Sequence, residues 1–497
     1  MEHYIFYCKL SLLAVLSLIT ACCMLSRRWY VNLAAFLACL SGETFLAYLF
    51  FPGYILCPAA ASFIIIFLSR IWDLSRTPAK GNGADPIRLP VRSGIRESRL
   101  EFHYHYSNFL VYGGAGSGKT KSIGKWLLSE YMRLGFAGFI YDFKDTDYTR
   151  TAYNLIKRHR YPHKFYYVSF DRPERSYRFN PLKVVRDRTE LIQLMEDVLL
   201  ALLPKKEQQN EWVAGGLGIL RGVAFRFWDE FPEHCTLPHI LAFIMTASAR
   251  QLSLFLQQNL VSEMLAGAYL KAEGSEKTQA SYLSTLCNNL ATVSQNEEIA
   301  YVLSGDDFDF NLIDPEPPKL FAVSNNFSKN SVYAPVISML MTISARQFSM
   351  QNRVPFVYFL DEMTTVNIKN FETLPSVLRE YKAAFILLTQ SGAKLEKLYG
   401  KLDRSSVEAN FGNMFLGRTK DVEALKYYPL FFGKEEKERR SRSSGKSGAS
   451  SSSSVTVSSQ KEDILPGKGF CRSRTGRIYR LRHACQRQLL QGKAGDV

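Results

Sequence analysis

The chain has 497 residues, enough for two or three domains, and its apolar fraction of 46% is ordinary for a globular protein. None of its nine cysteines and eight histidines has the spacing of a zinc site, which argues against zinc-dependent chemistry. The formal net charge of +16 indicates a polyanionic partner or an anionic membrane face, although a basic surface can also serve solubility alone.

Three apolar segments open the chain, at about 4–25, 31–51 and 54–70. The first two are close to the roughly 20 residues that a spanning helix needs, and the third is short but usable. No small-residue cleavage site follows the first segment, so we do not interpret it as a removed signal peptide. Residues 1–75 are therefore predicted to form a transmembrane module.

Basic residues set the predicted orientation of this module. Arg27 and Arg28 lie between the first two segments, and a longer run of basic residues follows the third. Since positive residues stay in the cytoplasm, three spans with an outside N-terminus place both groups inside. Two spans, with part of 31–69 re-entrant, are the alternative, and they would put the arginine pair outside. Glu43 is expected to face another helix, as a packing contact or as a proton relay.

A glycine-rich stretch, GGAGSGKT at 113–120, lies between an apolar run and a helical pattern. Its spacing matches the P-loop, whose backbone N–H groups surround the phosphates of a nucleotide. Lys119 is predicted to reach the β- and γ-phosphates, and the Thr120 hydroxyl to ligate Mg²⁺. The predicted nucleotide-binding residues are Gly113, Gly114, Ala115, Gly116, Ser117, Gly118, Lys119, Thr120 and Lys121.

Short apolar and β-branched runs predict the strands of the same domain. Because these runs are almost continuously apolar, they indicate a parallel sheet that is covered on both faces. The runs are 109–113, 138–142, 164–170, 319–325, 356–360, 383–391 and 413–418. The predicted fold class is therefore α/β, a RecA-like P-loop domain formed by 76–185 and 307–497.

The region between the early and late strands has helical periodicity instead. Examples are the segments 188–203 and 211–231, in which apolar residues recur at helical spacing. The region also separates Lys119 from the next acidic motif, at Asp361, by 242 residues, which is more than a minimal P-loop domain needs. We predict an all-α domain at 186–306, inserted into the nucleotide-binding domain.

The apolar run FVYFL at 356–360 ends in Asp361 and Glu362. In a metal-assisted NTPase, one acidic residue at the end of a buried strand holds the metal and another polarises the attacking water. We therefore predict that Asp361 holds Mg²⁺ through its water shell and that Glu362 is the general base. Gln390 ends the next strand and is predicted to sense the γ-phosphate, since ligands bind at the carboxyl ends of such strands. Capping of its own strand is the simpler alternative for Gln390.

The C-terminal part is basic and partly of low complexity. The Ser-rich segment 434–460 is predicted to be a disordered linker. The segment 469–482 is predicted to be a β-hairpin that turns near Thr475 and Gly476. From residue 434 onward there are 15 Lys and Arg against six Asp and Glu, a net charge of +9. The arginines of this hairpin could equally well contact DNA phosphates or simply face solvent; they are Arg472, Arg474, Arg477, Arg480 and Arg482.

Together these features resemble the coupling proteins of bacterial type IV secretion and conjugation, over essentially the whole chain. The motifs that carry the resemblance are the apolar N-terminus, GGAGSGKT, YDFKD at 141–145, FNPL at 179–182, FLDE at 359–362 and LTQSGAKLEKLYG at 388–400. The resemblance implies a hexameric, ring-shaped ATPase of the inner membrane, with ATP and Mg²⁺ as cofactors and its ATPase domain in the cytoplasm. Its implied partners are a relaxase-bound single DNA strand and the components of the secretion channel.

A ring also implies an arginine that each subunit supplies to its neighbour, because charge develops on the γ-phosphate in the transition state. Arg379 lies 18 residues after Asp361 and 11 before Gln390, and a comparable arginine is the proposed finger in the coupling proteins. Arg418 is the second candidate. The alternative for Arg379 is a surface residue that the dipole of its helix favours.

Two other functions stay open at this point. The same motor could move mainly protein effectors, and no feature of the sequence separates that cargo from DNA. A docking scaffold that binds nucleotide without hydrolysing it is the third class. The intact set of Lys119, Thr120, Asp361 and Glu362 argues against such a scaffold.

Overall fold

The structure is a computed structural model. It describes residues 45, 48, 50, 85–93, 96–144, 146–203, 210–313, 318–349, 352, 354–447, 450–472, 477–482 and 492–493. By its contacts the chain divides into residues 1–84 and residues 85–497, and the elements below belong to the second unit. Apart from three positions, the predicted transmembrane segments lie outside the described residues. Within the described residues, no helix is both long enough and apolar enough to cross a bilayer.

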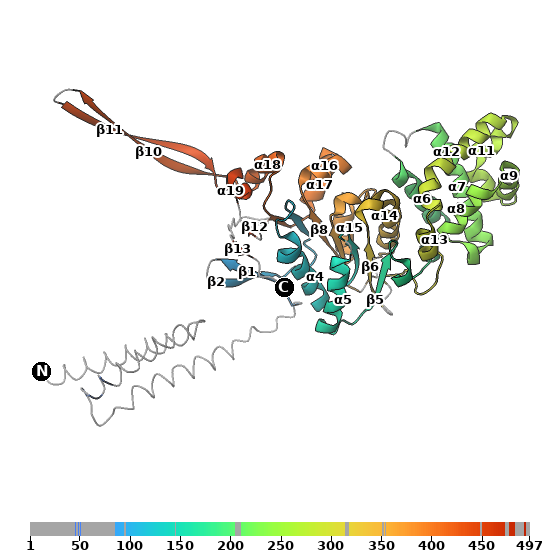
Figure 1. Cartoon of the computed structure of the whole chain (residues 1–497), viewed down its shortest axis with the longest axis horizontal. Helices are drawn as coiled ribbons and strands as arrows, with labels where there is room; N and C mark the ends of the chain where they lie inside the picture. Colours follow the sequence, from blue (N-terminus) through green and yellow to red (C-terminus); the bar gives the residue numbers. More distant parts are fainter. Residues whose placement is uncertain are drawn as a thin grey trace. The chain divides into compact units, whose positions relative to one another are not determined.

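A large sheet organises the second unit (Figure 1). Its strand order is β2-β1-β13-β12-β9-β3-β8-β7-β4-β6-β5, and the strands from β9 to β5 run parallel to one another. The strands are β1 (Ile87–Ser93), β2 (Arg96–Phe102), β3 (Phe109–Tyr112), β4 (Ala137–Asp142), β5 (Lys164–Ser169), β6 (Lys319–Ser324), β7 (Phe356–Asp361), β8 (Ala383–Thr389), β9 (Asn413–Leu416), β12 (Arg477–Arg482) and β13 (Gly492–Lys493). All seven predicted apolar runs form strands of the parallel part, so the prediction of a mostly parallel α/β fold is confirmed.

Helices cover both faces of this sheet, as the continuous apolar runs predicted. In β3, Phe109 and Val111 belong to one core, which includes residues of α4 and α5, whereas Leu110 and Tyr112 belong to the other, which includes residues of α14. The helices around the sheet are α4 (Lys125–Arg133), α5 (Asp147–His159), α14 (Asn330–Arg346), α15 (Leu374–Glu380), α16 (Gly392–Tyr399), α17 (Lys401–Ala409), α18 (Val422–Phe432) and α19 (Gly467–Arg472).

The described residues between α6 and α13 contain helices and no strand, and they gather beside α14 in Figure 1. Polar caps start several of these helices: the Asp187 side chain, for example, accepts the N–H of Glu190 at the start of α6 (2.9 Å). The helices are α6 (Arg188–Leu202), α7 (Glu211–Glu230), α8 (Leu237–Thr246), α9 (Ala249–Gln257), α10 (Leu260–Leu265), α11 (Gly267–Lys271), α12 (Glu276–Ser294) and α13 (Glu297–Leu303). Their assignment to a separate inserted domain stays a prediction.

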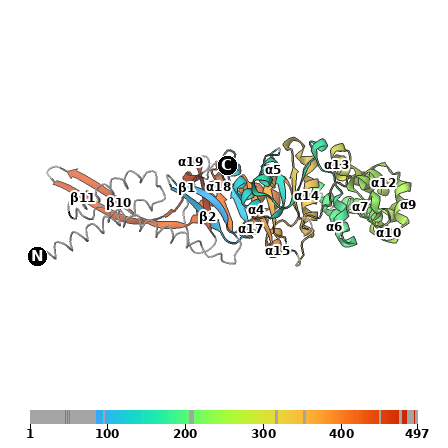
Figure 2. The same cartoon turned by 90° about the horizontal axis from the view of Figure 1, so that it is seen from below.

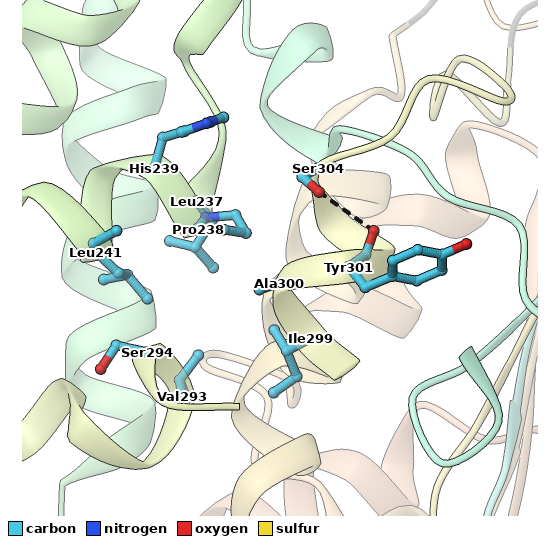
Figure 3. A pocket seen from close by; sticks show the side chains of 11 residues that line it. Leu237, Pro238, His239, Leu241, Val293, Ser294, Ile299, Ala300, Tyr301 and Ser304 are labelled. Atoms are coloured by element: carbon cyan, nitrogen blue, oxygen red, sulfur yellow. Dashed lines mark hydrogen bonds between the residues drawn. The ribbon is translucent and has the colours of Figure 1, made fainter. Parts of the chain in front are cut away.

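This helical segment has a cavity of about 360 Å³ between α8, the end of α12 and α13 (Figure 3). Leu241, Val293 and Ile299 contribute apolar side chains to its wall. The guanidinium carbon of Arg178 lies 4.7 Å from the centre of the Tyr301 ring, at the junction with the sheet domain. Most of the residues that line this cavity are apolar, and they leave few polar groups on its wall.

The prediction of a disordered linker at 434–460 is wrong for this structure. The segment forms a two-stranded antiparallel ribbon of β10 (Lys434–Ser447) and β11 (Ser450–Asp463), shown in Figure 2. Near its base Glu435 faces Glu462, but opposite charges face each other on either side of that pair, with Lys434 opposite Asp463 and Glu436 opposite Lys461. Such cross-strand pairs stabilise a ribbon, and the low-complexity composition concealed them.

The predicted hairpin at 469–482 is also wrong. Its first half is the helix α19, in which Phe470 is buried with its ring 5.3 Å from that of Tyr428 and 5.9 Å from that of Phe432. Its second half, β12, pairs antiparallel with β9 of the main sheet. The apolar contact with α18 and the open sheet edge therefore determine the local structure here.

Candidate active site

The P-loop connects β3 to α4 at the place where three parallel strands end. The N–H of Gly113 donates to the last carbonyl of β8 (3.2 Å), and the N–H of Gly114 donates to the carbonyl of Arg418, two residues after β9 (2.8 Å). Gly116 and Gly118 have φ angles of +68° and +94°, which only glycine adopts without strain. The loop therefore curls at the carboxyl edge of the sheet, where phosphate sites of α/β proteins occur.

Lys119 folds back over this loop. Its side chain is buried, and its Nζ donates a hydrogen bond to the carbonyl oxygen of Gly113. Burial lowers the pKa of Lys119, and the nearby carboxylates of Glu362 and Asp361 oppose that shift. The structure thus brings Lys119 close to the acidic pair Asp361 and Glu362, which begins 242 residues later in the sequence.

One turn of π-helix, Thr120–Gly124, follows the P-loop before α4 begins. Gly124 allows this turn to approach α5, because a Cβ there would lie 2.2 Å from the Oη of Tyr148. Tyr148 is itself buried, with its ring centre 4.6 Å from that of Phe359 in β7. Turns of this kind occur frequently at functional sites, and at this one Gly124 lies against Tyr148 of α5 and Leu388 of β8.

Asp361 is the last residue of β7 and is completely buried. Within the described part of the chain, neither of its carboxylate oxygens has a hydrogen-bond partner. Burial raises the pKa of Asp361 to about 7, and the ammonium group of Lys144 partly opposes this shift. A buried carboxylate without partners is costly, and such groups mark sites that receive a cation or a reacting proton.

Glu362 follows with a left-handed backbone, at a φ angle of +48°. This conformation costs a residue with a Cβ on the order of 1 kcal/mol or more, and strain of this kind clusters at active sites. Its Oε1 lies 3.3 Å from the Nζ of Lys394 in α16, while its buried Oε2 has no partner among the described residues. Glu362 is thus held at one oxygen and free at the other, as a general base requires.

A second lysine reaches the P-loop from the end of β4. The Nζ of Lys144 donates to the Oγ1 of Thr120 (3.3 Å). Asp142 shapes this turn, because its carboxylate accepts the N–H of Lys144 (3.2 Å) and both the N–H and the hydroxyl of Thr149. The sequence alone predicts no role for Lys144 or Lys394, although the motifs YDFKD and LTQSGAK contain them.

Gln390 lies directly after β8, and it is half-buried. The carbonyl of the preceding residue, Thr389, accepts the N–H of Gly113, so the Gln390 backbone lies beside the start of the P-loop. Because β8 lies between β3 and β7, Gln390 also follows the strand next to that of Asp361. Its predicted role as a γ-phosphate sensor stays a prediction.

Arg379 lies at the other edge of the sheet. It is exposed near the C-terminus of α15, and β8 begins only at Ala383, opposite the first residue of β7. Asp361, by contrast, lies at the far end of β7, opposite Leu388. The structure therefore does not bring Arg379 to the P-loop of its own chain, and its assignment as a finger stays a prediction that needs a second subunit.

Arg418 contacts the P-loop of its own chain. Its Nη2 donates to the carbonyl oxygen of Gly116 (3.3 Å), and its own carbonyl accepts the N–H of Gly114. From the sequence, Arg418 is the second candidate for a finger that acts on a neighbouring subunit. The structure instead favours a role for Arg418 within its own subunit, because the end of β9 places it against the loop.

The groups around the P-loop fit a nucleotide with a divalent cation. Three ammonium groups, those of Lys119, Lys144 and Lys394, lie around the loop and the acidic pair, which suits phosphate oxygens. The unpartnered oxygens of Asp361 and the hydroxyl of Thr120 are the hard oxygen ligands that Mg²⁺ prefers. Among the described residues, no group of three or more His, Cys, Asp and Glu side chains is placed to hold a metal ion.

The remaining predicted binding residues line the same loop. Ser117 is buried and its Oγ has no partner within the described residues, whereas Ala115 is exposed at the turn of the loop. Lys121 is exposed in the π-helical turn. The parallel sheet, the loop at its carboxyl edge and the acidic end of β7 together define a P-loop nucleotide-binding protein.

The chain matches the model of the type IV secretion-system coupling protein DNA-binding domain over residues 100–465. It therefore belongs to the family of type IV secretion-system coupling proteins, which confirms the resemblance seen in the sequence. The comparison with curated proteins found no match.

Solved structures of coupling proteins have the same fold at low sequence identity. The unbound bacterial conjugative coupling protein TrwBdeltaN70 is 16% identical, with a TM-score of 0.61 over 85% of this chain and 92% of that one. The plasmid coupling protein TrwB in complex with ADP and Mg²⁺ is 15% identical, with a TM-score of 0.59 over 82% and 96% of the two chains. TrwB with a non-hydrolysable ATP analogue is 15% identical, with a TM-score of 0.58 over 79% and 89%.

Proposed function

We propose that this chain is a Mg²⁺-dependent ATPase that couples ATP hydrolysis to the transfer of DNA through a type IV secretion or conjugation channel. The observation that carries the ATPase assignment is the buried acidic pair beside the P-loop. Asp361 and the Oε2 of Glu362 lack partners in the described residues, and both carboxylates are close enough to Lys119 to oppose the lowering of its pKa. Such a pair is expensive to bury unless a cation and a reaction use it.

Each of these groups has a proposed task. Lys119 binds the β- and γ-phosphates, and Thr120 and Asp361 hold Mg²⁺. The ion, when bound, neutralises the negative charge that develops on the transferred phosphate. Glu362 accepts a proton from the attacking water at its free Oε2, while Lys394 holds the other oxygen. Gln390, beside the start of the P-loop, reports the presence of the γ-phosphate to α16.

Two kinds of observation, the family relationship and the charge, support DNA as the cargo. The matched family description is that of a DNA-binding domain, and the relatives include a bacterial conjugative coupling protein. The chain carries a net charge of +16, which favours a polyanionic cargo. We infer that the cargo is a relaxase-bound single strand.

The remaining parts of the proposal concern location and assembly. The apolar segments of residues 1–75 anchor the protein in the inner membrane as a multi-pass module, with the ATPase part in the cytoplasm. Residues 76–185 and 307–497 form the ATPase domain, and 186–306 are inserted as an all-α domain that selects cargo. The subunits form a homohexamer, in which Arg379 completes the site of the neighbouring subunit.

An ATPase assay of the full chain in detergent tests this proposal. Mg²⁺-dependent hydrolysis should be measurable, and single-stranded DNA should stimulate it. Glu362→Gln should keep ATP binding and lose turnover by about 100-fold or more, since only the base is removed. Glu263→Gln, which changes an exposed glutamate of α10 outside the site, is the matched control.

The possible failures of this assay are distinct. Unchanged turnover in Glu362→Gln would reject the assignment of the base. Stimulation by no form of DNA would favour protein effectors as the cargo. Nucleotide binding by the wild-type protein without any hydrolysis would favour a docking scaffold.

A further inference from the structure

A second cavity lies at the open edge of the sheet, beside β5. It has a volume of about 500 Å³, within the roughly 300–1,000 Å³ of ligand pockets. Its walls come from α5, from the edge strand β5 and from the chain that follows β5. No step of the proposed ATPase reaction uses this cavity.

Aromatic rings make up much of its wall. Phe165 and Tyr167 are two residues apart in β5, so their side chains lie on the same face of the strand. Tyr153 of α5 and Tyr177 line the cavity too, and 54% and 44% of their surfaces are exposed. The N–H of Tyr177 donates to the carbonyl of Tyr167 (3.1 Å), which fixes the later segment along the outer edge of β5.

The charged residues of the wall are all basic. Arg150, Arg172 and Arg175 line the cavity, and none of its described lining residues is acidic. Arg150 and Arg175 are exposed. The wall therefore combines π-faces with positive charge at an accessible surface.

Two described carboxylates close in sequence to the wall residues pair with lysines outside the wall. Asp147 pairs with Lys125 (2.9 Å), and Asp171 pairs with Lys329 (3.3 Å). Glu174 lies 4.0 Å from Arg175, at the limit of an ion pair, and both side chains are largely exposed. A surface pair of this kind contributes little, so Arg175 can exchange it for a ligand anion.

This combination differs from the cavity in the helical segment (Figure 3), whose wall offers mainly apolar contact and a single histidine. Bases stack on aromatic side chains while arginines contact the phosphates, and this is how single strands are bound without sequence preference. A duplex keeps its bases stacked internally and could offer such a wall only its backbone.

We propose that the cavity between α5 and β5 binds an unstacked nucleotide of single-stranded DNA, with Tyr153 and Tyr177 contacting the base and Arg150 and Arg175 the phosphates. The proposal rests on the proposed function only in its choice of DNA as the cargo. The site would let each subunit hold the strand independently of its P-loop.

Binding of a dye-labelled oligothymidylate by the full chain in detergent tests the site. Tyr153→Ala should weaken affinity about fivefold or more, since a stacked base contributes roughly 1–3 kcal/mol. Tyr153→Phe keeps the ring and should bind like the wild type. Arg150→Gln should reduce the slope of log affinity against log salt by about one.

Tyr104→Ala is the matched control, because Tyr104 is also exposed (56%) but lies before β3, five strands from β5 and roughly 24 Å away at about 4.8 Å per strand. Equal melting temperatures establish that the variants are folded. A strand containing 5-iodouracil, cross-linked to the wild-type protein by light, gives a second readout that needs no variant. The cross-link should map to the peptides that contain Tyr153 or Tyr177.

Unchanged affinity in Tyr153→Ala, with cross-links only elsewhere, would overturn the site and leave the proposed function intact. A wild-type protein that binds no single strand would overturn both. Competition by free thymidine monophosphate at the same concentration of nucleotide units would assign the cavity to free nucleotides instead. If Tyr153→Ala bound DNA normally but no longer bound an acidic, aromatic peptide, the cavity would be assigned to protein cargo.

Discussion

Replacing Arg404 by alanine should destabilise the protein and slow ATP turnover, although Arg404 lies outside the P-loop and the acidic pair. Its Nε donates to the Oε1 of Glu408 (3.0 Å), and its Nη1 donates to the Oε2 of Glu396 (2.9 Å). Glu408 also accepts the hydroxyls of Tyr112 (2.7 Å) and Tyr427 (2.8 Å). Since Tyr112 directly precedes the P-loop, this network connects α16 and α17 to β3.

The expected loss of stability follows from the burial of the Arg404 and Glu408 side chains. The Arg404 and Glu408 side chains are 14% and 6% exposed, so the mutation leaves a nearly buried carboxylate without its counter-charge. Breaking a buried pair costs about 3–5 kcal/mol, and we expect the lower end because two tyrosine hydroxyls still solvate Glu408. The guanidinium also lies 4.6 Å from the centre of the Tyr427 ring, a cation–π contact that adds on the order of 1 kcal/mol.

The effect on turnover has a separate cause. A Cβ on Gly392 would lie 2.4 Å from the Nη2 of Arg404, so the guanidinium packs directly against the first residue of α16. Gln390 lies two residues earlier. Without the guanidinium, this turn loses its support, and we expect a loss of turnover smaller than that of Glu362→Gln.

Urea unfolding and ATPase assays of the full chain measure the two effects. Arg404→Lys keeps the charge but cannot bridge two carboxylates as a planar fork, so its loss of stability should be intermediate. Arg158→Ala, at an exposed arginine of α5, is the control for the loss of a surface charge. Wild-type unfolding and turnover in Arg404→Ala would refute this account of the network.

Three further changes have expected outcomes. Gly124→Ala should destabilise the protein by about 1–3 kcal/mol, because the new Cβ would collide with the buried hydroxyl of Tyr148. Adding Tyr148→Phe should restore part of this stability, and thermal melting of both variants measures the two effects. Lys394→Ala should reduce turnover by about fivefold, because a partly exposed ion pair such as Lys394–Glu362 contributes at most about 1 kcal/mol to positioning the base. Turnover equal to that of the wild type would exclude a positioning role for Lys394. Subunits with Arg379→Ala mixed with subunits carrying Lys119→Ala should regain activity that neither has alone, and no recovery in verified mixed rings would remove Arg379 from the site.

The parallel sheet could be predicted from the sequence because each strand carries its own signal. Runs such as Phe356–Asp361 are buried along their whole length, so every residue must be apolar until the strand reaches the edge. The acidic pair Asp361 and Glu362 then stands out, because packing alone gives little reason to place two carboxylates at the end of a buried strand. The P-loop has a comparable local signal, since its glycines are needed for the backbone itself.

Elements that depend on distant partners could not be predicted in this way. Phe470 lies in a helix because it packs on α18, and β12 exists because β9 offers an open edge. The strands β1 and β2, with the alternating polar sequences IRLPVRS and RESRLEF, were not predicted from apolar runs either. The roles of Lys144 and Arg418 likewise depend on which strands are neighbours, which the sequence order does not reveal.

A bound nucleotide with its cation would replace existing hydrogen bonds of the two lysines, but it would give Asp361 a partner that it lacks within the described residues. Lys119 and Lys144 each donate to an oxygen of the P-loop segment, at Gly113 and Thr120, so phosphate oxygens would exchange one acceptor for another. Asp361 has no partner to exchange within the described residues, and its burial disfavours the charged form. A cation therefore removes a cost that a nucleotide alone cannot remove. It follows that the largest gain of free energy at this site comes from a ligand that brings phosphate and a divalent cation together.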